Sequence, residues 1–330
     1  MSDVTTTDLY EVTMALSYLL EDMSRPATFS LFVRDLPPER GFLVSAGIEP
    51  ALDYLSAFRV TSADVEDFAS ALHRPYADLS PLCGTTFAGE VRAIPEGRVV
   101  FAGEPLLEVT APLAEAQLVE TFLLNQVSHQ TAVASKAVRS VLAAAGRPVI
   151  DFSLRRTHGT SAGMQAARTA SLTGFAGTSN VVEALTRSGA PIDVYAVGTR
   201  VGTSADAPYL DSAYKLVEYD GRPVMKLSSA KVTSPGCKQV FRRPGGDDVI
   251  ALWDEPGPAG AEPLLRTVMR NGRRLGPPDT LPEGHARLTT DLASLPADAV
   301  RIRAPRPARA VFSERLSELT EGLSERLRSS

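Results

Sequence analysis

The stretch VIDFSLRRTHGTSAGMQAARTASL, Val149–Leu172, decides the fold class of this chain. Its first five residues have the pattern of a short strand, and Thr160–Leu172 has the spacing of a helix rich in small residues. The alternation continues along the chain, with strands predicted over 175–178 and 193–197 and a helix over 181–187. Because strands that alternate with helices form βαβ units, the sequence predicts an α/β fold with parallel pairing in this region.

Each of the three predicted strands runs into a segment rich in Gly, Ser and Thr. Arg155, Arg156 and His158 follow the first strand, while FAGTSN (175–180) and VGTRVGTSADAP (197–208) end the other two. Guanidinium groups bind carboxylate and phosphate oxygens in pairs, and backbone N–H groups in small-residue turns approach anions closely. Because α/β folds bind ligands at the carboxyl ends of their strands, we expect an anion-binding pocket there. The alternative is that the arginines only form surface ion pairs.

The residues before this unit predict antiparallel strands and long helices. Apolar and polar residues alternate over 28–44 and 91–112 around turns that contain proline, as in antiparallel strands. Helical spacing predicts one helix over 8–20 and one long or two consecutive helices over 113–145. These segments belong to a first, mainly antiparallel part of the chain.

The residues after the unit predict a hairpin, a loop-like stretch and a final helix. Asp220-Gly221 is a two-residue hairpin signal between two apolar runs. The stretch 243–278 is rich in Pro, Gly and charge, so we expect it to be largely loop-like, with LLRTVMRNGRRL (264–275) within it a candidate for a short element. Over 311–327, leucines recur on one helix face, which predicts an amphipathic helix.

The composition limits the kinds of partner. The chain has 330 residues, with 34 Lys and Arg against 39 Asp and Glu, a net charge of −5. This balance argues against non-specific binding to nucleic acid or to an anionic membrane. Cys83 and Cys237 lie far apart with no CxxC or Cys/His cluster, which indicates neither a disulfide framework nor a zinc site. We find no secretion signal and no apolar run of roughly 18 residues, and we expect a cytoplasmic protein.

Seven segments together resemble bacterial nicotinate phosphoribosyltransferases. They are, in the order of that family, DLYEVTMA (8–15), FxLFVRDLPxxRGFLVxAG (29–47), DFSLRRTHG (151–159), GFAGTSN (174–180), APIDVYAVGTRVGTSADAP (190–208), KLVEYDGRPVMKLS (215–228) and GCKQVFR (236–242). The resemblance implies an α/β fold, in which an N-terminal α/β sandwich domain joins an irregular (β/α) barrel of the type II phosphoribosyltransferase kind, and a dimer. It implies a reaction that joins nicotinate to phosphoribosyl pyrophosphate for NAD synthesis, with Mg²⁺, and with ATP hydrolysis coupled through a phosphorylated histidine.

On this resemblance we divide the chain into four parts. They are the N-terminal α/β sandwich domain (1–112), the connecting helices (113–146), the truncated barrel with its ligand loops (147–242), and a C-terminal segment with an amphipathic helix (243–330).

The resemblance also implies which residues would bind the substrates. Phe152 would stack on the pyridine ring, Arg155 would bind anionic oxygens of the ligand, and Tyr10 would cover the other face of the ring from the neighbouring subunit. The alternative for Phe152 and Tyr10 is that they are core aromatics. His158 is interpreted as a loop residue, because the family's phosphorylated histidine lies in another motif. Phosphate would be held by Thr178, Ser179, Gly198, Thr199 and Arg200.

The sequence departs from the family after Asn180. In the family four more βα units follow, whereas here VVEALTRS leads straight into GAPIDVYAVGTR. The missing half of the barrel includes the phosphorylated histidine and the acidic strand ends that would position magnesium, so we assign no catalytic residue and no metal ligand. A barrel of this length cannot close with eight units. We predict an incomplete barrel with open edges, which favours a homo-oligomer.

Three functions stay open at this stage. The first is a nicotinate phosphoribosyltransferase with impaired turnover, and the second is a non-catalytic relative that binds a pyridine nucleotide or a phosphoribosyl compound, or serves as a partner subunit. The third is a defective product with no stable fold. The first two take small molecules as ligands and exclude nucleic acid and membranes as partners.

Overall fold

The computed structural model describes residues 3–180, 195–226, 233–245 and 247–329. The helix predicted over 181–187 and the first two residues of the strand predicted over 193–197 lie outside this range. The largest unit is an antiparallel sheet with the strand order β10-β9-β1-β5-β3-β14-β15. Its strands are β1 (Pro26–Val33), β3 (Glu90–Ala93), β5 (Pro105–Pro112), β9 (Ser212–Tyr219), β10 (Arg222–Pro223), β14 (Arg266–Arg270) and β15 (Arg273–Arg274).

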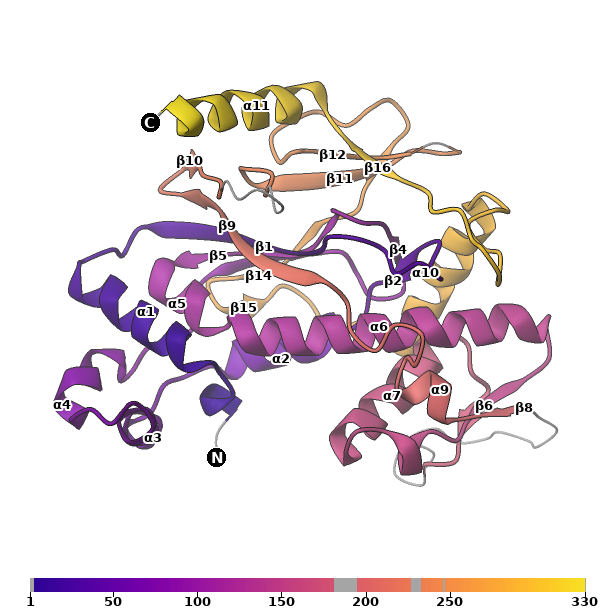
Figure 1. Cartoon of the computed structure of the whole chain (residues 1–330), viewed down its shortest axis with the longest axis horizontal. Helices are drawn as coiled ribbons and strands as arrows, with labels where there is room; N and C mark the ends of the chain where they lie inside the picture. Colours follow the sequence, from indigo (N-terminus) through magenta and orange to yellow (C-terminus); the bar gives the residue numbers. More distant parts are fainter. Residues whose placement is uncertain (1–2, 181–194, 227–232, 246, 330) are drawn as a thin grey trace.

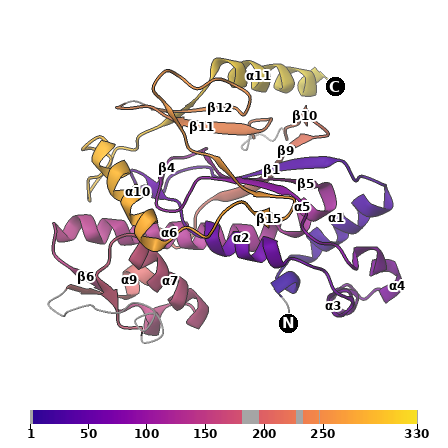
Figure 2. The same ribbon diagram turned by 180° about the vertical axis from the view of Figure 1, so that it is seen from behind.

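Helices cover one face of this central sheet, and a second sheet covers the other (Figure 1). Figure 2 shows the same layers from behind. The helices on the first face are α1 (Leu9–Leu20), α2 (Ile48–Ala57), α5 (Leu113–Leu118) and α6 (Glu120–Ala144), with η1 (Asp3–Thr5), α3 (Ser62–Leu72), α4 (Tyr76–Leu79) and η2 (Ser80–Leu82) beside them. The second sheet has the order β13-β11-β12-β16, formed by β11 (Lys238–Arg242), β12 (Asp248–Leu252), β13 (Glu262–Pro263) and β16 (Ala310–Phe312). The helix α11 (Glu314–Ser329) lies above it, and β2 (Leu43–Val44) pairs with β4 (Val99–Val100).

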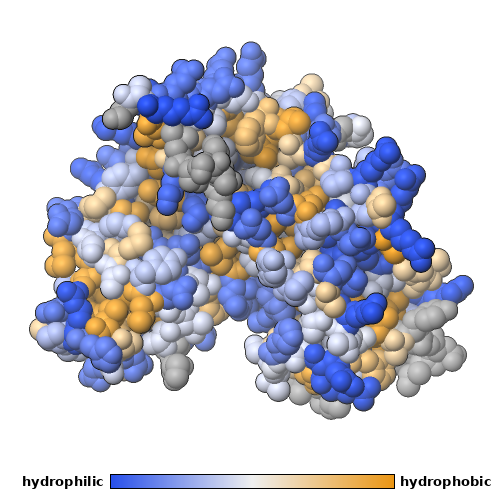
Figure 3. Space-filling view, viewed as in Figure 1, coloured by the Kyte–Doolittle hydropathy of each residue, from blue (hydrophilic) through white to orange (hydrophobic). Residues whose placement is uncertain are grey.

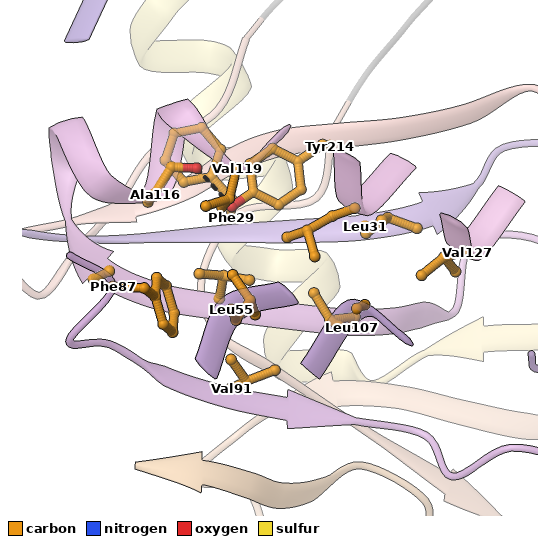
Figure 4. Packing of buried hydrophobic residues seen from close by; sticks show 14 of the residues in the cluster. Phe29, Leu31, Leu55, Phe87, Val91, Leu107, Ala116, Val119, Val127 and Tyr214 are labelled. Carbon is orange, nitrogen blue, oxygen red and sulfur yellow. Dashed lines mark hydrogen bonds between the residues drawn. The ribbon is translucent and has the colours of Figure 1, made fainter. Parts of the chain in front are cut away.

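The alternation predicted for the first strand places its apolar side chains in the core between sheet and helices. Phe29 and Leu31 of β1 are buried, and the Phe29 ring stacks on Tyr214 of β9 with 4.8 Å between ring centroids. The Tyr214 hydroxyl donates a hydrogen bond of 2.9 Å to the carbonyl oxygen of Ala116 in α5 (Figure 4). A buried tyrosine hydroxyl needs such a partner, so this residue ties two neighbouring strands to a helix.

Buried charges fix the stacking of the two sheets. Glu108 of β5 and Lys238 of β11 are 0% and 2% exposed. The Glu108 carboxylate accepts a hydrogen bond of 3.0 Å from the Lys238 backbone and lies 3.0 Å from an Arg92 guanidinium nitrogen. Burial lowers the pKa of Lys238, and the Glu108 charge opposes that shift. Because buried charges are costly unless paired, β11 has one favourable position on the central sheet.

The parallel unit follows α6 and forms a separate, open sheet. Its order is β7-β6-β8, and both neighbours run parallel to β6. A cluster of buried apolar side chains packs this unit against α6: Ala137, Val149, Ala170, Phe175 and Val201. The elements of this unit are β6 (Val149–Asp151), η3 (Leu154–Arg156), α7 (Thr160–Leu172), β7 (Gly177–Thr178), β8 (Tyr195–Val197) and α9 (Thr199–Gly202), and α10 (Leu281–Ser294) packs on α7. The open sheet confirms the predicted fold class, an α/β sandwich joined to an incomplete barrel.

Several predicted elements are confirmed. The helix α7 has the predicted bounds, and the region predicted as one or two helices forms α5 and α6. Asp220 and Gly221 have φ angles of 50° and 70°, the left-handed values that the predicted two-residue turn requires, and join β9 to β10. The final amphipathic helix is α11.

The loop-like prediction for 243–278 is wrong for β12, whereas β14 and β15 lie in the 264–275 segment, for which the sequence leaves a short element open. This stretch contains β12, all five residues of which are buried, and β14, which pairs with β3 in the central sheet. Both strands have only five residues and are separated by Pro- and Gly-rich turns, so local composition resembles that of a loop. Long-range pairing and burial override the local signal here.

None of the described helices is long and apolar enough to cross a membrane. Cys83 and Cys237 are both free thiols, and Cys83 is exposed.

Candidate functional site

The ends of the three parallel strands lie side by side. Asp151, the last residue of β6, pairs with Thr178 at the end of β7 and with Val197 at the end of β8. The Gly-, Ser- and Thr-rich segments that follow therefore leave the sheet at one edge, as the sequence predicts.

Asp151 organises this edge, a role that sequence reasoning missed. Its side chain is 1% exposed. One carboxylate oxygen accepts a hydrogen bond of 2.9 Å from the Ser153 backbone, and the other accepts one of 2.9 Å from the Thr178 hydroxyl. The Asp151 carbonyl oxygen accepts a further bond of 2.8 Å from the backbone of Ser179. Because one residue bonds to both turns, it fixes the loop after β6 relative to the loop after β7.

Phe152 lies at the surface, directly against the turn that follows β8. Its backbone N–H donates a hydrogen bond of 2.7 Å to the carbonyl oxygen of Val197. A Cβ atom on Gly198 would lie only 2.9 Å from the Phe152 carbonyl oxygen, so glycine permits this close approach. The Phe152 side chain is 40% exposed. The alternative that Phe152 is a core aromatic is therefore wrong, and its ring is open to a flat ligand.

Several basic residues follow these strand ends with their side chains exposed. Arg155 and Arg156 lie in η3, His158 follows them, and Arg200 lies in α9 next to the exposed Thr199. None of the three arginines has a side-chain hydrogen bond or ion pair to another residue in the described part of the chain. The alternative, that these arginines only form surface ion pairs, is therefore not supported by the described residues. Their guanidinium groups are accessible to an anionic ligand.

Tyr10 is the one predicted ligand residue that the fold does not bring to this edge. It lies on α1 and is 48% exposed. Figure 1 places α1 at the opposite end of the helical layer from β6 and α9, and Figure 3 shows the surface hollowed between these two lobes. Within one chain Tyr10 cannot cover a ring stacked on Phe152, so any such contact requires a second copy.

An ion cluster beside the site was also missed. Arg40, in the turn after β1, is 1% exposed and binds Asp206, in the segment between α9 and β9, with both guanidinium nitrogens. Lys136 of α6 binds the same carboxylate at 3.1 Å. The partners are far apart in sequence, so no spacing rule identifies them. The available signal was that Arg40 and Asp206 both lie inside the quoted motifs.

The strand ends do not by themselves form a metal site. Among the residues that the structure describes, there is no group of three or more His, Cys, Asp or Glu side chains that could hold a metal ion. Asp151 is the carboxylate at the described strand ends, and hydrogen bonds already engage both of its oxygens. These residues do not fit a protein-held Mg²⁺.

Comparisons with known proteins agree with this architecture. Residues 5–128 match the family model of the nicotinate phosphoribosyltransferase (NAPRTase) N-terminal domain. The nicotinate phosphoribosyltransferase pncB2 of Mycobacterium tuberculosis is 34% identical over 382 residues, covering 82% of this chain and 82% of that protein. The chain belongs to the nicotinate phosphoribosyltransferase family. The nicotinate phosphoribosyltransferase of Bacillus subtilis is 39% identical over 372 residues, covering 76% of each chain.

The fold of this family member matches that of a solved human relative. The crystal structure of human nicotinic acid phosphoribosyltransferase superposes with a TM-score of 0.81 at 24% identity, covering 96% of this chain and 99% of that chain. The aligned length of 382 residues with the Mycobacterium protein exceeds the 330 residues of this chain. That alignment must therefore contain gaps in this chain, in agreement with a family member that lacks the central part of the barrel.

Proposed function

We propose that this protein binds nicotinate and phosphoribosyl pyrophosphate at the common edge of β6, β7 and β8, and acts in NAD biosynthesis as a nicotinate phosphoribosyltransferase. The observation that supports this most is the convergence of the three strand ends on Asp151, beside an exposed aromatic ring and arginines that pair with no other described residue. Family membership supplies the identity of the substrates.

In this proposal each predicted site residue has a role that its surroundings support. The exposed Phe152 ring stacks on the pyridine ring, and Arg155 binds the nicotinate carboxylate. The turns after β7 and β8 hold phosphate through backbone N–H groups and small side chains, with Arg200 adding charge. These turns carry Thr178, Ser179, Gly198, Thr199 and Arg200.

We expect turnover to be slow in the lone chain. Phosphoribosyl transfer depends on groups that are positioned to stabilise charge as it develops, and removing such groups costs most of the rate enhancement. The described part of the chain places one carboxylate, Asp151, at the strand ends, and hydrogen bonds already engage it. The aligned gaps favour a second candidate function, a non-catalytic relative that binds a pyridine nucleotide or a phosphoribosyl compound.

Mg²⁺ and ATP stay predictions from the family resemblance. Because the described residues do not fit a protein-held Mg²⁺, the ion would have to enter bound to the pyrophosphate of the substrate. The cytoplasmic location likewise stays a prediction, which rests on the sequence composition.

We further propose that the protein is a homo-oligomer in which α1 of one copy approaches the strand ends of another. Support comes from five apolar or aromatic side chains of α1 that are exposed: Leu9 (44%), Tyr10 (48%), Met14 (37%), Leu19 (38%) and Leu20 (66%). Such an accumulation on one surface helix is typical of an interface. In this arrangement Tyr10 would cover the ligand held by the other copy.

The decisive experiment measures binding and turnover separately. Calorimetry with nicotinate and with phosphoribosyl pyrophosphate tests the site, and formation of nicotinate mononucleotide with Mg²⁺ and ATP present tests the reaction. Binding with turnover supports the transferase, and binding without turnover supports the non-catalytic relative. If neither compound binds at millimolar concentration, the proposed function is wrong.

A further inference from the structure

An ion cluster formed by Arg40, Lys136 and Asp206 holds the chain between the parallel unit and the central sheet. The Arg40 guanidinium contacts both oxygens of the Asp206 carboxylate, through Nη1 to Oδ2 and through Nη2 to Oδ1 at 3.1 Å. Lys136 Nζ lies 3.1 Å from the same Oδ1. The Arg40 and Lys136 side chains are 1% and 21% exposed, and that of Asp206 is 24% exposed. Two cations, one of them the buried Arg40 guanidinium, therefore share one partly exposed carboxylate.

The charges keep Asp206 ionised. Burial alone raises the pKa of the Asp206 carboxyl, but hydrogen bonds and charge from Arg40, and then from Lys136, outweigh it, so the pKa lies well below its ordinary value. A bidentate pair between guanidinium and carboxylate fixes direction as well as distance. Asp206 is thus held in one position relative to Arg40.

The three residues come from three parts of the fold. Arg40 ends the turn after β1, where its backbone N–H bonds to the Pro37 carbonyl oxygen at 2.8 Å. Lys136 lies in α6, and Asp206 lies between α9 and β9. Figure 1 shows the chain crossing α6 on its way from α9 to β9. The cluster fastens that crossing segment to both the central sheet and the long helix.

The start of this segment, α9, packs against the loop after β6. A Cβ atom on Gly202 would lie 2.4 Å from Cβ of Ser153 and 2.7 Å from Cγ2 of Thr157, so α9 is in direct contact with that loop. Arg40 Nη2 also donates a hydrogen bond of 3.3 Å to the Ser204 hydroxyl, two residues after Gly202. The turn that begins at Gly198 is therefore fixed at one side by the loop that carries Phe152 and at the other by Arg40.

We propose that Arg40, Lys136 and Asp206 form a positioning cluster that sets the place of the 198–200 turn for binding the phosphate of a phosphoribosyl compound. The inference deepens the proposed function and rests on it for the identity of the ligand. The three residues act through the segment that they hold and are not assigned contact with the ligand.

An apolar anchor in the same turn is the competing explanation. Val201 is 4% exposed and belongs to the buried cluster with Ala137 of α6 and Val149 of β6. If this anchor alone holds the turn, loss of the ion cluster will leave the turn in place. Local stability of 199–207 therefore distinguishes the two explanations.

Amide hydrogen exchange measures that stability directly. Backbone N–H groups from Val201 to Ala205, and that of Ala207, all donate hydrogen bonds within the segment, so their exchange is slow only while the turn is formed. We expect Asp206→Asn, and independently Lys136→Met, to speed exchange over 199–207 by at least about tenfold, with exchange in β1 and β5 unchanged. The control is Asp53→Asn, which weakens a more exposed pair with Arg274 (2.7 Å) elsewhere in the fold and should leave 199–207 unchanged.

Calorimetry on the same variants provides the ligand readout. We expect both variants to weaken binding of phosphoribosyl pyrophosphate by about tenfold, within the range for residues that act through others, and to leave binding of nicotinate within twofold. Unchanged exchange over 199–207 in the two folded variants would overturn the cluster's role, as would faster exchange with unchanged affinity for phosphoribosyl pyrophosphate. If the unmodified protein binds no phosphoribosyl pyrophosphate, the proposed function fails, and the exchange data alone still decide whether the cluster positions the turn. If Asp206→Asn does not fold, Lys136→Met decides.

Discussion

The backbone carbonyl oxygen of Phe152 lies 2.9 Å from the position that a Cβ atom would occupy on Gly198. The backbone of Phe152 and the turn that begins at Gly198 are thus closely packed, so a larger residue at position 198 must displace one of them. We expect Gly198→Ala to cost about 1–3 kcal/mol in free energy of unfolding, because the clash involves backbone that cannot rotate away. Thermal and denaturant unfolding measure this cost. The control Gly276→Ala, with no atom near its Cβ position, should stay within about 0.5 kcal/mol of the parent, and an equal effect of both changes would contradict the contact.

Arg155 tests whether the first strand end binds the nicotinate carboxylate. Arg155→Ala should weaken nicotinate binding by about 1.5–3 kcal/mol, the range for a hydrogen bond to a charged group. Stability should not change, since the side chain is exposed and bonds to no other described residue. Calorimetry with nicotinate measures the affinity. Arg303→Ala, an exposed arginine in the C-terminal segment, is the control, and an unchanged dissociation constant in Arg155→Ala would remove Arg155 from the site.

Glu11 of α1 makes stability depend on pH. Burial raises the pKa of its carboxyl from 4.5 to about 7, although hydrogen bonds from Thr121 and Thr7 lower it in part. A carboxyl whose folded pKa is raised binds its proton more tightly when folded. The contribution of Glu11 to the free energy of unfolding is therefore complete below pH 4.5 and is lost as the pH rises through 7. The total change is about 3 kcal/mol.

Glu11→Gln should remove this dependence. We expect the variant to be more stable than the parent at pH 8 and similar at pH 4.5, as measured by urea unfolding across that range. Glu21→Gln, an exposed change just after the same helix, should follow the parent curve. The same pH slope in Glu11→Gln as in the parent would show that another group is responsible.

Leu20 tests the proposed oligomer. It is 66% exposed on α1, so Leu20→Glu should leave folding intact and place a charge in the proposed interface. Sedimentation should then show dissociation, because an unpaired charge in an apolar interface is costly. Leu327→Glu on α11, where the leucine is 47% exposed, is the control. If both variants sediment like the parent, α1 is not the interface.

The sequence identified those elements whose signal is local. The helix α7 was predicted with its bounds because small residues recur at helical spacing between a glycine turn and Thr173, and the hairpin was predicted from Asp220-Gly221 because only a few residues adopt its left-handed angles. The sequence did not predict short strands whose pairing partners are distant in the chain. Thr267 of β14 pairs with Arg92, and nothing in the five residues of β14 indicates that partner.

In the candidate site, too, some features could be predicted from the sequence and others could not. The three strand ends were predicted together because parallel strands of one sheet end at one edge, and Asp151 pairs as that rule requires. The ion pair of Arg40 with Asp206 could not be predicted, because charge partners separated by 166 residues leave no periodic signal. The exposure of Phe152 could not be predicted either, because the sequence does not distinguish an aromatic residue in the core from one at the surface.

The position of β1 between β5 and β9 has a consequence for synthesis of the chain. β5 is translated soon after β1, but β9 begins only at Ser212. At roughly 5–20 residues per second, the ribosome needs on the order of ten seconds or more to travel from Val33 to Tyr219. During that time one edge of β1 has no partner, and such an edge can pair with another nascent chain. A shorter connection between β1 and β9 shortens this interval, so the gaps in this chain relative to the Mycobacterium protein also let the central sheet form sooner.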